Sequence, residues 1–243
     1  MQAVLNAWEM ERHHAAERNL YPECITALQQ IKEEHPEVII GAVTDGRANP
    51  LLMSFTLAPF FDFCLSWEDD QAGRKKFFQD LGAVDGNAQL KWIYDAALEK
   101  YLELSAAKTA LSGVSERNSV DNAAAANQVW IHVGDDLAYD VGGSSQSGAK
   151  TIWLELNEDK YQQTARQRFD EENAKNQPAW STTSRSELEK RRVMNDLALD
   201  KVDRKIHFFS GLPEAINEIL AEENENAAAA GGSLAKEEEM VEK

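Results

Sequence analysis

The chain has 243 residues, 43% of them hydrophobic, which is long enough for one large domain or for one domain with a small cap. Its 42 acidic and 25 basic residues give a net charge of −17 with no basic patch, so nucleic acid and an anionic membrane surface are not expected as partners. No apolar run has the length of a membrane span, no secretory signal opens the chain, and Cys24 and Cys64 lack disulfide or metal spacing, so we expect a cytoplasmic protein.

Two helices are expected at the start of the chain. Residues 1–20 contain no glycine or proline and carry scattered apolar side chains. His13 and His14 are adjacent, so on a helix they point in different directions, and we expect surface residues rather than a metal pair. Residues 23–34 have helical apolar spacing, and His35-Pro36 should end that helix.

The first strand is expected at residues 38–43, where continuous apolar character suits a parallel strand that is buried on both faces. It ends in Thr44-Asp45-Gly46. The hydroxyl and the free amides of such a turn could bind a phosphate. A simple hydroxyl-capped turn is the alternative, because such turns commonly follow strands.

A short helix at 49–56 and a second strand at 60–67 come next. The basic pair Lys75-Lys76 follows. One of these lysines could reach a bound phosphate as a point charge, although a solvated basic turn explains the pair equally well. Residues 90–104 have the pattern of an amphipathic helix, and residues 105–127 are interpreted as an inserted loop.

The most informative stretch predicts a strand, an acidic loop, a helix and a second strand. An apolar run at 129–133 ends in Gly134-Asp135-Asp136, a helix-length segment follows at 137–147, and another apolar run spans 151–156. This is the pattern of a βαβ unit. Its acids follow the first strand, and ligands bind at the carboxyl ends of the strands in an open parallel sheet.

Three acids of this loop, Asp135, Asp136 and Asp140, are expected to converge. Such a cluster of negative charge is unfavourable alone. Mg²⁺ would offset it, because this ion takes carboxylate oxygens and keeps several waters. The alternative is that Asp136 caps a helix and Asp140 is a solvated acid in the first helical turn.

The remaining sequence completes an alternation of helices and strands. Residues 157–204 are highly charged and look like a surface insertion. A last strand is expected at 205–210 and a helix from there to 220, whereas the acidic tail at 221–243 should be disordered. The alternation predicts an α/β fold with a doubly wound, Rossmann-like parallel sheet.

These strand ends resemble the haloacid dehalogenase-like (HAD) hydrolase superfamily, particularly its phosphatases with a helical cap. The segment VGDDLAYDVGGSSQSGAKTIW is very similar to the fourth motif of that family, and it places Gly134, Asp135 and Asp140 on the motif positions. GAVTDGRANP resembles the second motif, with Thr44 as its hydroxyl residue. The resemblance covers roughly residues 20 to 156, and KIHFFSGLPEAI echoes the last strand and helix of the family.

The third motif is degraded. Lys75 aligns best with the family lysine, but Lys76 stands where proline is usual, so Lys76 remains a rival. By this resemblance, residues 1–20 are the C-terminal part of the cap. Residues 21–220 are then the HAD-like core, with insertions at 105–127 and 157–204.

The family nucleophile is missing, because the first aspartate of the chain is Asp45 and no Asp-x-Asp motif precedes it. The chain is therefore expected to start inside the cap, as a fragment, a truncated gene product or a degenerate protein. In the family the absent strand lies between the strands that end here at Val43 and Val133. Its absence would leave two apolar strand edges facing a gap, so we expect an unstable chain or one that borrows a strand.

The resemblance implies Mg²⁺-dependent hydrolysis of a small phosphomonoester through an aspartyl-phosphate. It assigns Mg²⁺ to Asp135 and Asp140, and catalysis to Thr44 and Lys75. The substrate phosphate would be bound by the strand-end residues and the lysine: Thr44, Asp45, Gly46 and Lys75. Without the nucleophile, this chain alone should be inactive. A non-catalytic HAD-like binding protein is the alternative, and a response-regulator-like domain fits poorly because no aspartate ends an early strand.

Overall fold

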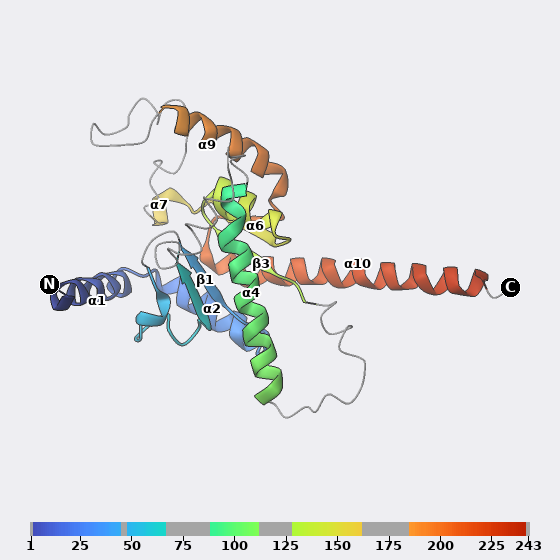
Figure 1. The fold of residues 1–243 in the computed structure, drawn as a ribbon, viewed down its shortest axis with the longest axis horizontal. Helices are drawn as coiled ribbons and strands as arrows, with labels where there is room; N and C mark the ends of the chain where they lie inside the picture. The colour runs from blue at the N-terminus through green and yellow to red at the C-terminus, as the bar shows by residue number, and fades with distance from the viewer. Residues whose placement is uncertain (1, 45–47, 67–87, 112–127, 162–184, 242–243) are drawn as a thin grey trace.

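The computed structural model describes residues 2–44, 48–66, 88–111, 128–161 and 185–241 (Figure 1). Within these residues five short strands alternate with helices, and every strand pair is parallel. The predicted α/β class is thereby confirmed. The family-level assignment remains a prediction.

The strands form two separate parallel sheets. β1 (Gly41–Thr44) pairs with β2 (Phe63–Ser66), and β3 (Ile131–Gly134) pairs with β4 (Lys150–Leu154), which in turn pairs with β5 (Arg204–Ile206). The order is β1-β2 in one sheet and β3-β4-β5 in the other. Among the described residues, β1 and β3 therefore belong to different sheets, and these are the two strands between which the family resemblance placed the missing strand.

Most of the described α-helices are longer than the strands. The first half of the chain contains the helices α1 (Gln2–Arg18), α2 (Pro22–Glu34) and α4 (Ala88–Leu111). The 3₁₀ turn η1 (Pro50–Leu52) lies between α2 and α4 in the sequence. The second half contains η2 (Leu137–Val141), α6 (Gly142–Gln146), α7 (Glu158–Tyr161), α9 (Arg185–Ala198), η4 (Leu199–Lys201), η5 (Phe209–Gly211) and α10 (Leu212–Val241).

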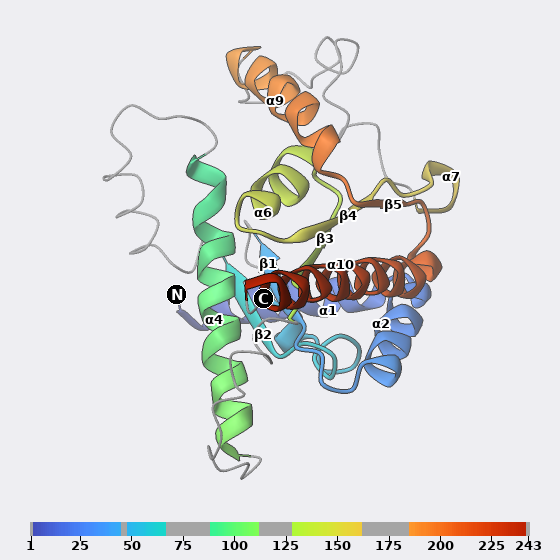
Figure 2. The ribbon, with the colours of Figure 1, turned by 90° about the vertical axis from the view of Figure 1, so that its right-hand side faces the viewer.

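One hydrophobic core joins the two sheets. α2 and α10 pack against each other and supply most of its buried side chains, together with Ile152 of β4. Partly buried apolar residues pack on this cluster, including Ile40 just before β1 and Ile131 and Val133 of β3. α2 and α10 therefore pack against the sheet of β3, β4 and β5 and against the residues just before β1 (Figure 2).

α4 packs against β1 and β2 and also contacts α6. Near its C-terminal end, Lys108 pairs with Asp62, whose carboxylate also accepts the Ile40 N–H at the start of β1. Near its N-terminal end, Tyr94 donates its hydroxyl to the Tyr139 carbonyl in the loop after β3. β1 therefore starts at one end of α4, and β3 ends at the other (Figure 2).

Two sequence predictions differ from the structure. His13 is 2% exposed and its Nε2 accepts the Asn49 N–H at 3.1 Å, because the C-terminal half of α1 packs on the segment that carries η1. The prediction that His13 lies at the surface was therefore wrong. The tail at 221–243 was expected to be disordered, but α10 continues to Val241 and projects from the body (Figure 1). Alanine and glutamate have high helix propensity and favour a helix there, although Gly231 and Gly232 lower the helix propensity of this segment.

Candidate functional site

The candidate site is the loop that follows β3. Gly134 ends the strand, Asp135 and Asp136 follow, and the predicted helix at 137–147 is divided into the π-helical turn η2 and the short helix α6. The turn is closed by the Val141 N–H, which bonds to the Asp136 carbonyl five residues earlier. Such π turns occur frequently at functional sites in helices.

Asp140 folds back over the end of β3. Its Oδ2 accepts the Asp136 N–H at 2.9 Å, and its Oδ1 lies 3.3 Å from the Tyr94 hydroxyl. A Cβ atom on Gly134 would lie 2.1 Å from Asp140 Oδ2, so only glycine leaves room for this carboxylate. The Asp140 side chain is 26% exposed. Asp140 therefore holds the loop and is not a simple solvated acid.

Asp136 caps the helical turn, which was the alternative to metal binding in the sequence analysis. Its Oδ1 accepts the Tyr139 N–H at 2.9 Å and so caps the η2 turn. Its other carboxylate oxygen pairs with Arg191 of α9, and the Arg191 guanidinium lies 3.9 Å from the centre of the Tyr139 ring. This acid is thus committed to capping and to holding α9 against η2.

Thr44 ends β1 and Asp135 directly follows β3, so the two residues lie at the carboxyl ends of edge strands of the two sheets. Both are half-buried, and Thr44 is in register with Ser66 across the β1–β2 pair. The Asp135 carbonyl accepts the Trp153 indole N–H at 3.2 Å, which ties the loop to β4. Tyr94 and Lys108 are about 21 Å apart along α4. β1 starts near Lys108 and runs toward the end of α4 where Tyr94 contacts the acidic loop (Figure 2).

Three further residues around this loop had no signal in the sequence. His132 of β3 has its ring edge-on to Tyr94, with centroids 4.9 Å apart, and its Nε2 lies 3.7 Å from Asp140 Oδ1. This nitrogen is buried and makes no hydrogen bond within the described part of the chain. Tyr94, His132 and Arg191 come from elements that only tertiary contacts bring to the loop.

The other predicted site residues, Asp45, Gly46, Lys75 and its rival Lys76, lie outside the described residues. In the part of the chain that the structure describes, no three histidine, cysteine, aspartate or glutamate side chains are arranged to hold a metal ion. Mg²⁺ needs only one or two protein carboxylates, because it keeps most of its waters. Asp140 already accepts the Asp136 N–H and lies within hydrogen-bond distance of the Tyr94 hydroxyl.

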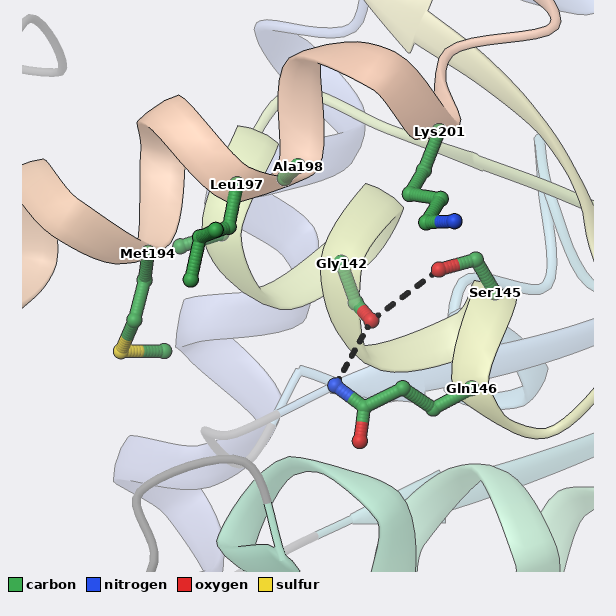
Figure 3. Close-up of a pocket in the computed structure, with 8 residues that line it drawn as sticks. Gly142, Ser145, Gln146, Met194, Leu197, Ala198 and Lys201 are labelled. Atoms are coloured by element: carbon green, nitrogen blue, oxygen red, sulfur yellow. Dashed lines mark hydrogen bonds between the residues drawn. The ribbon is translucent and has the colours of Figure 1, made fainter.

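A cavity of about 280 Å³ lies on the α9 side of the same βαβ unit (Figure 3). Met194, Leu197 and Ala198 of α9 form one wall of it. The opposite wall comes from α6, where Ser145 and Gln146 both donate to the Gly142 carbonyl at 3.1 Å. The residues that line it do not include Thr44, Asp135 or Asp140, so this cavity is separate from the strand-end acids.

Comparison with known proteins gives no relative for this chain. No protein-family model, curated protein or solved structure matches it. Among the described helices, none is both long and apolar enough to span a membrane. The function is therefore inferred from the geometry around β1 and β3 and from the motif resemblance.

Proposed function

We propose that this chain is the metal- and phosphate-binding part of a HAD-like, Mg²⁺-dependent phosphatase that acts on a small phosphomonoester. The observation that carries the proposal is that, within the described residues, β1 and β3 belong to separate sheets. The motif resemblance puts the missing nucleophile strand between these two strands. Thr44 and the Gly134–Asp135 turn end these two strands.

In this proposal the end of β3 binds the metal ion and the end of β1 binds the phosphate. Asp135 binds Mg²⁺, which would neutralise phosphate charge and stabilise the transition state. Thr44 donates its hydroxyl to a phosphate oxygen, and Lys75 pairs with the phosphate as a point charge. Asp140 acts through its bond to the Asp136 N–H, which fixes the direction of the loop that carries Asp135. Asp140 is therefore a positioning residue.

Residues 1–243 alone should not turn over substrate. The proposed reaction needs an aspartate that attacks phosphorus and a second that protonates the leaving group. No aspartate precedes Asp45 in the sequence, so the Asp-x-Asp strand is not among these residues.

A non-catalytic binding protein is the second candidate. Acids of the loop already make bonds inside the protein, since Asp136 caps η2 and pairs with Arg191, and Asp140 accepts the Asp136 N–H. Under this candidate the acidic loop serves only to shape the end of β3. It predicts no Mg²⁺ site that depends on Asp135.

Calorimetric titration with Mg²⁺ separates the two candidates. Asp135→Asn should weaken the tightest Mg²⁺ binding by at least about tenfold, because a ligand is removed. The matched control is Asp159→Asn, which removes the same charge from an exposed position in α7. Equal binding by wild type and Asp135→Asn would overturn the metal assignment.

A turnover assay tests the missing nucleophile separately. With Mg²⁺ and p-nitrophenyl phosphate, residues 1–243 are expected to release no phosphate above the uncatalysed rate. Turnover that disappears in Asp135→Asn would show that the nucleophile lies within this chain, against the role proposed for an outside strand.

A further inference from the structure

The cavity beside α9 takes no part in the proposed phosphatase site, and the residues that line it all belong to the described part of the chain. Its volume is about 280 Å³. An apolar cavity of roughly 150 Å³ already binds benzene, so this one has room for a somewhat larger organic molecule. Most of its lining residues are apolar or glycine: Ala138, Gly142, Met194, Leu197 and Ala198. A ligand that fills it should therefore be largely apolar.

The cavity has a buried side and an open side. Ala138 of η2 and Ala198 of α9 are 1% and 2% exposed. Gly142 faces Ala198 so closely that a Cβ atom on this glycine would lie 3.2 Å from the Ala198 Cβ. Leu197, by contrast, is 61% exposed although it lines the same cavity. The protein without a ligand therefore leaves an apolar wall in water, and burying that wall under a ligand is favourable.

One end of the cavity carries a positive charge. Among the described residues that line it, Lys201 is the only charged one. Its backbone is anchored to β4, because the Lys201 carbonyl accepts the hydroxyl of the buried Thr151 at 2.5 Å. Its side chain makes no ion pair within the part of the chain that the structure describes. Figure 3 shows this side chain on the same side of the cavity as Ser145 and away from Met194. The ammonium is therefore available to an anion that enters the cavity.

The polar groups near Lys201 indicate which kind of anion fits. The Ser145 hydroxyl and the Gln146 amide both donate to the Gly142 carbonyl, so the lysine alone supplies the positive charge. A carboxylate carries one negative charge at neutral pH, whereas a phosphomonoester carries nearly two. In a chain with a net charge of −17, a single lysine therefore matches a carboxylate better than a phosphate.

We propose that this cavity binds an aliphatic monocarboxylate with a chain of about eight carbons. The carboxylate pairs with the Lys201 ammonium, and the hydrocarbon chain lies against Met194 and Leu197. The site shares no residue with the strand ends that carry Thr44 and Asp135, so it is independent of the proposed phosphatase function.

Titration with octanoate, followed by magnetic resonance of ¹³C-labelled methionine methyl groups, tests the site. The Met194 signal should shift saturably, with a dissociation constant of about 1 mM or below. The signal of Met53, which is buried at the end of η1 and does not line the cavity, should stay unchanged. Octanamide has the same chain without the charge, so it should bind at least about tenfold more weakly.

Two variants with matched controls separate the charged group from the chain. Lys201→Met should weaken octanoate binding at least about tenfold, whereas Lys100→Met removes a lysine of a surface ion pair in α4 and should have no effect. Leu197→Ala should weaken the binding of octanoate at least about threefold. Val193→Ala changes an exposed apolar residue of α9 that does not line the cavity, and it should leave binding unchanged.

An unmoved Met194 signal, or a Met53 signal that shifts along with it, would overturn the proposal. Equal binding of octanoate and octanamide, or unchanged octanoate binding by Lys201→Met, would contradict the pairing of a carboxylate with this lysine. Unchanged octanoate binding by Leu197→Ala would place the hydrocarbon chain outside this cavity.

Discussion

Gly134 is the residue at which the candidate site tolerates least change. A Cβ atom there would lie 2.1 Å from Asp140 Oδ2 and 2.3 Å from its Cγ. We expect Gly134→Ala to lower the free energy of unfolding by about 1–3 kcal/mol, because the Asp140 carboxylate must leave the Asp136 N–H. Urea unfolding followed by circular dichroism measures this.

Gly211→Ala is the matched control, because its new methyl group would have ordinary contact with Ile206 at 3.8 Å. Its free energy of unfolding should stay within about 0.5 kcal/mol of wild type. If Gly134→Ala is equally harmless, Asp140 does not occupy the space above the end of β3.

Asp136 combines two roles that substitution can separate. Asparagine can still accept the Tyr139 N–H as a cap, whereas alanine cannot, and both variants lose the ion pair with Arg191. Asp136→Ala should therefore cost about 1 kcal/mol more in unfolding free energy than Asp136→Asn. Equal losses in urea unfolding would show that the cap contributes nothing and that the pair with Arg191 carries the whole effect.

The sequence predicted part of this residue-level picture. The capping role of Asp136 followed from its position directly after a strand, because such caps depend only on local spacing. The contacts of Asp140 with Tyr94 and of Asp136 with Arg191 did not follow, since they join segments that are 46 and 55 residues apart. Likewise, nothing local distinguished buried His13 from its neighbour His14, because the difference comes from packing against η1.

Among the elements, Asp62 joins the starts of β1 and β2 to two helices. Its carboxylate accepts the Ile40 N–H at 2.8 Å and pairs with Lys32 of α2 at 3.1 Å and with Lys108 of α4 at 3.3 Å. Burial alone raises the pKa of Asp62, but the bonds from Ile40, Lys32 and Lys108 outweigh it, so that the pKa lies below its ordinary value.

A lowered pKa makes the contribution of Asp62 depend on pH. The contribution is complete above the unfolded-state pKa of about 3.9 and is lost as the pH falls through the lower folded-state value. Asp62→Asn should cost about 1–3 kcal/mol in unfolding free energy at pH 7, and the gap to wild type should narrow below about pH 4. Urea unfolding at several pH values tests this. A gap that stays constant down to pH 2 would mean that the carboxylate charge is not what joins these elements.

The end of α10 is a second element-level test, because sequence composition and structure disagree there. Residues 227–243 lie beyond the salt bridges that tie α10 to the body through Lys150–Glu223 and Arg204–Glu222. Deletion of these residues should reduce the far-ultraviolet helical signal and change the unfolding free energy by less than about 0.5 kcal/mol. An unchanged helical signal would support the disorder expected from composition.

For the whole molecule, the elements were more predictable than their assembly. Apolar runs located the five strands of the described residues, because a short apolar run bounded by polar or turn residues carries that information locally. The runs were longer than the strands. The apolar run at 38–43 contains only the first three residues of β1. The residues before them follow α2, and Val38 and Ile40 pack on the core before strand pairing starts. Division into two sheets depends on which strand has a neighbour. Local patterns do not encode that, and only the family resemblance indicated a gap between β1 and β3.

The most direct test of the account is a magnetic resonance titration with Mn²⁺, a paramagnetic substitute for Mg²⁺. Mn²⁺ should broaden the amide signals of both Asp135 and Thr44, Mg²⁺ should reverse the broadening, and Asp135→Asn should abolish it. The Ile40 and Asp62 amides, at the opposite ends of the strands, should stay sharp. Broadening that survives Asp135→Asn, or that reaches Asp135 without Thr44, would contradict a shared metal and phosphate site at these two strand ends.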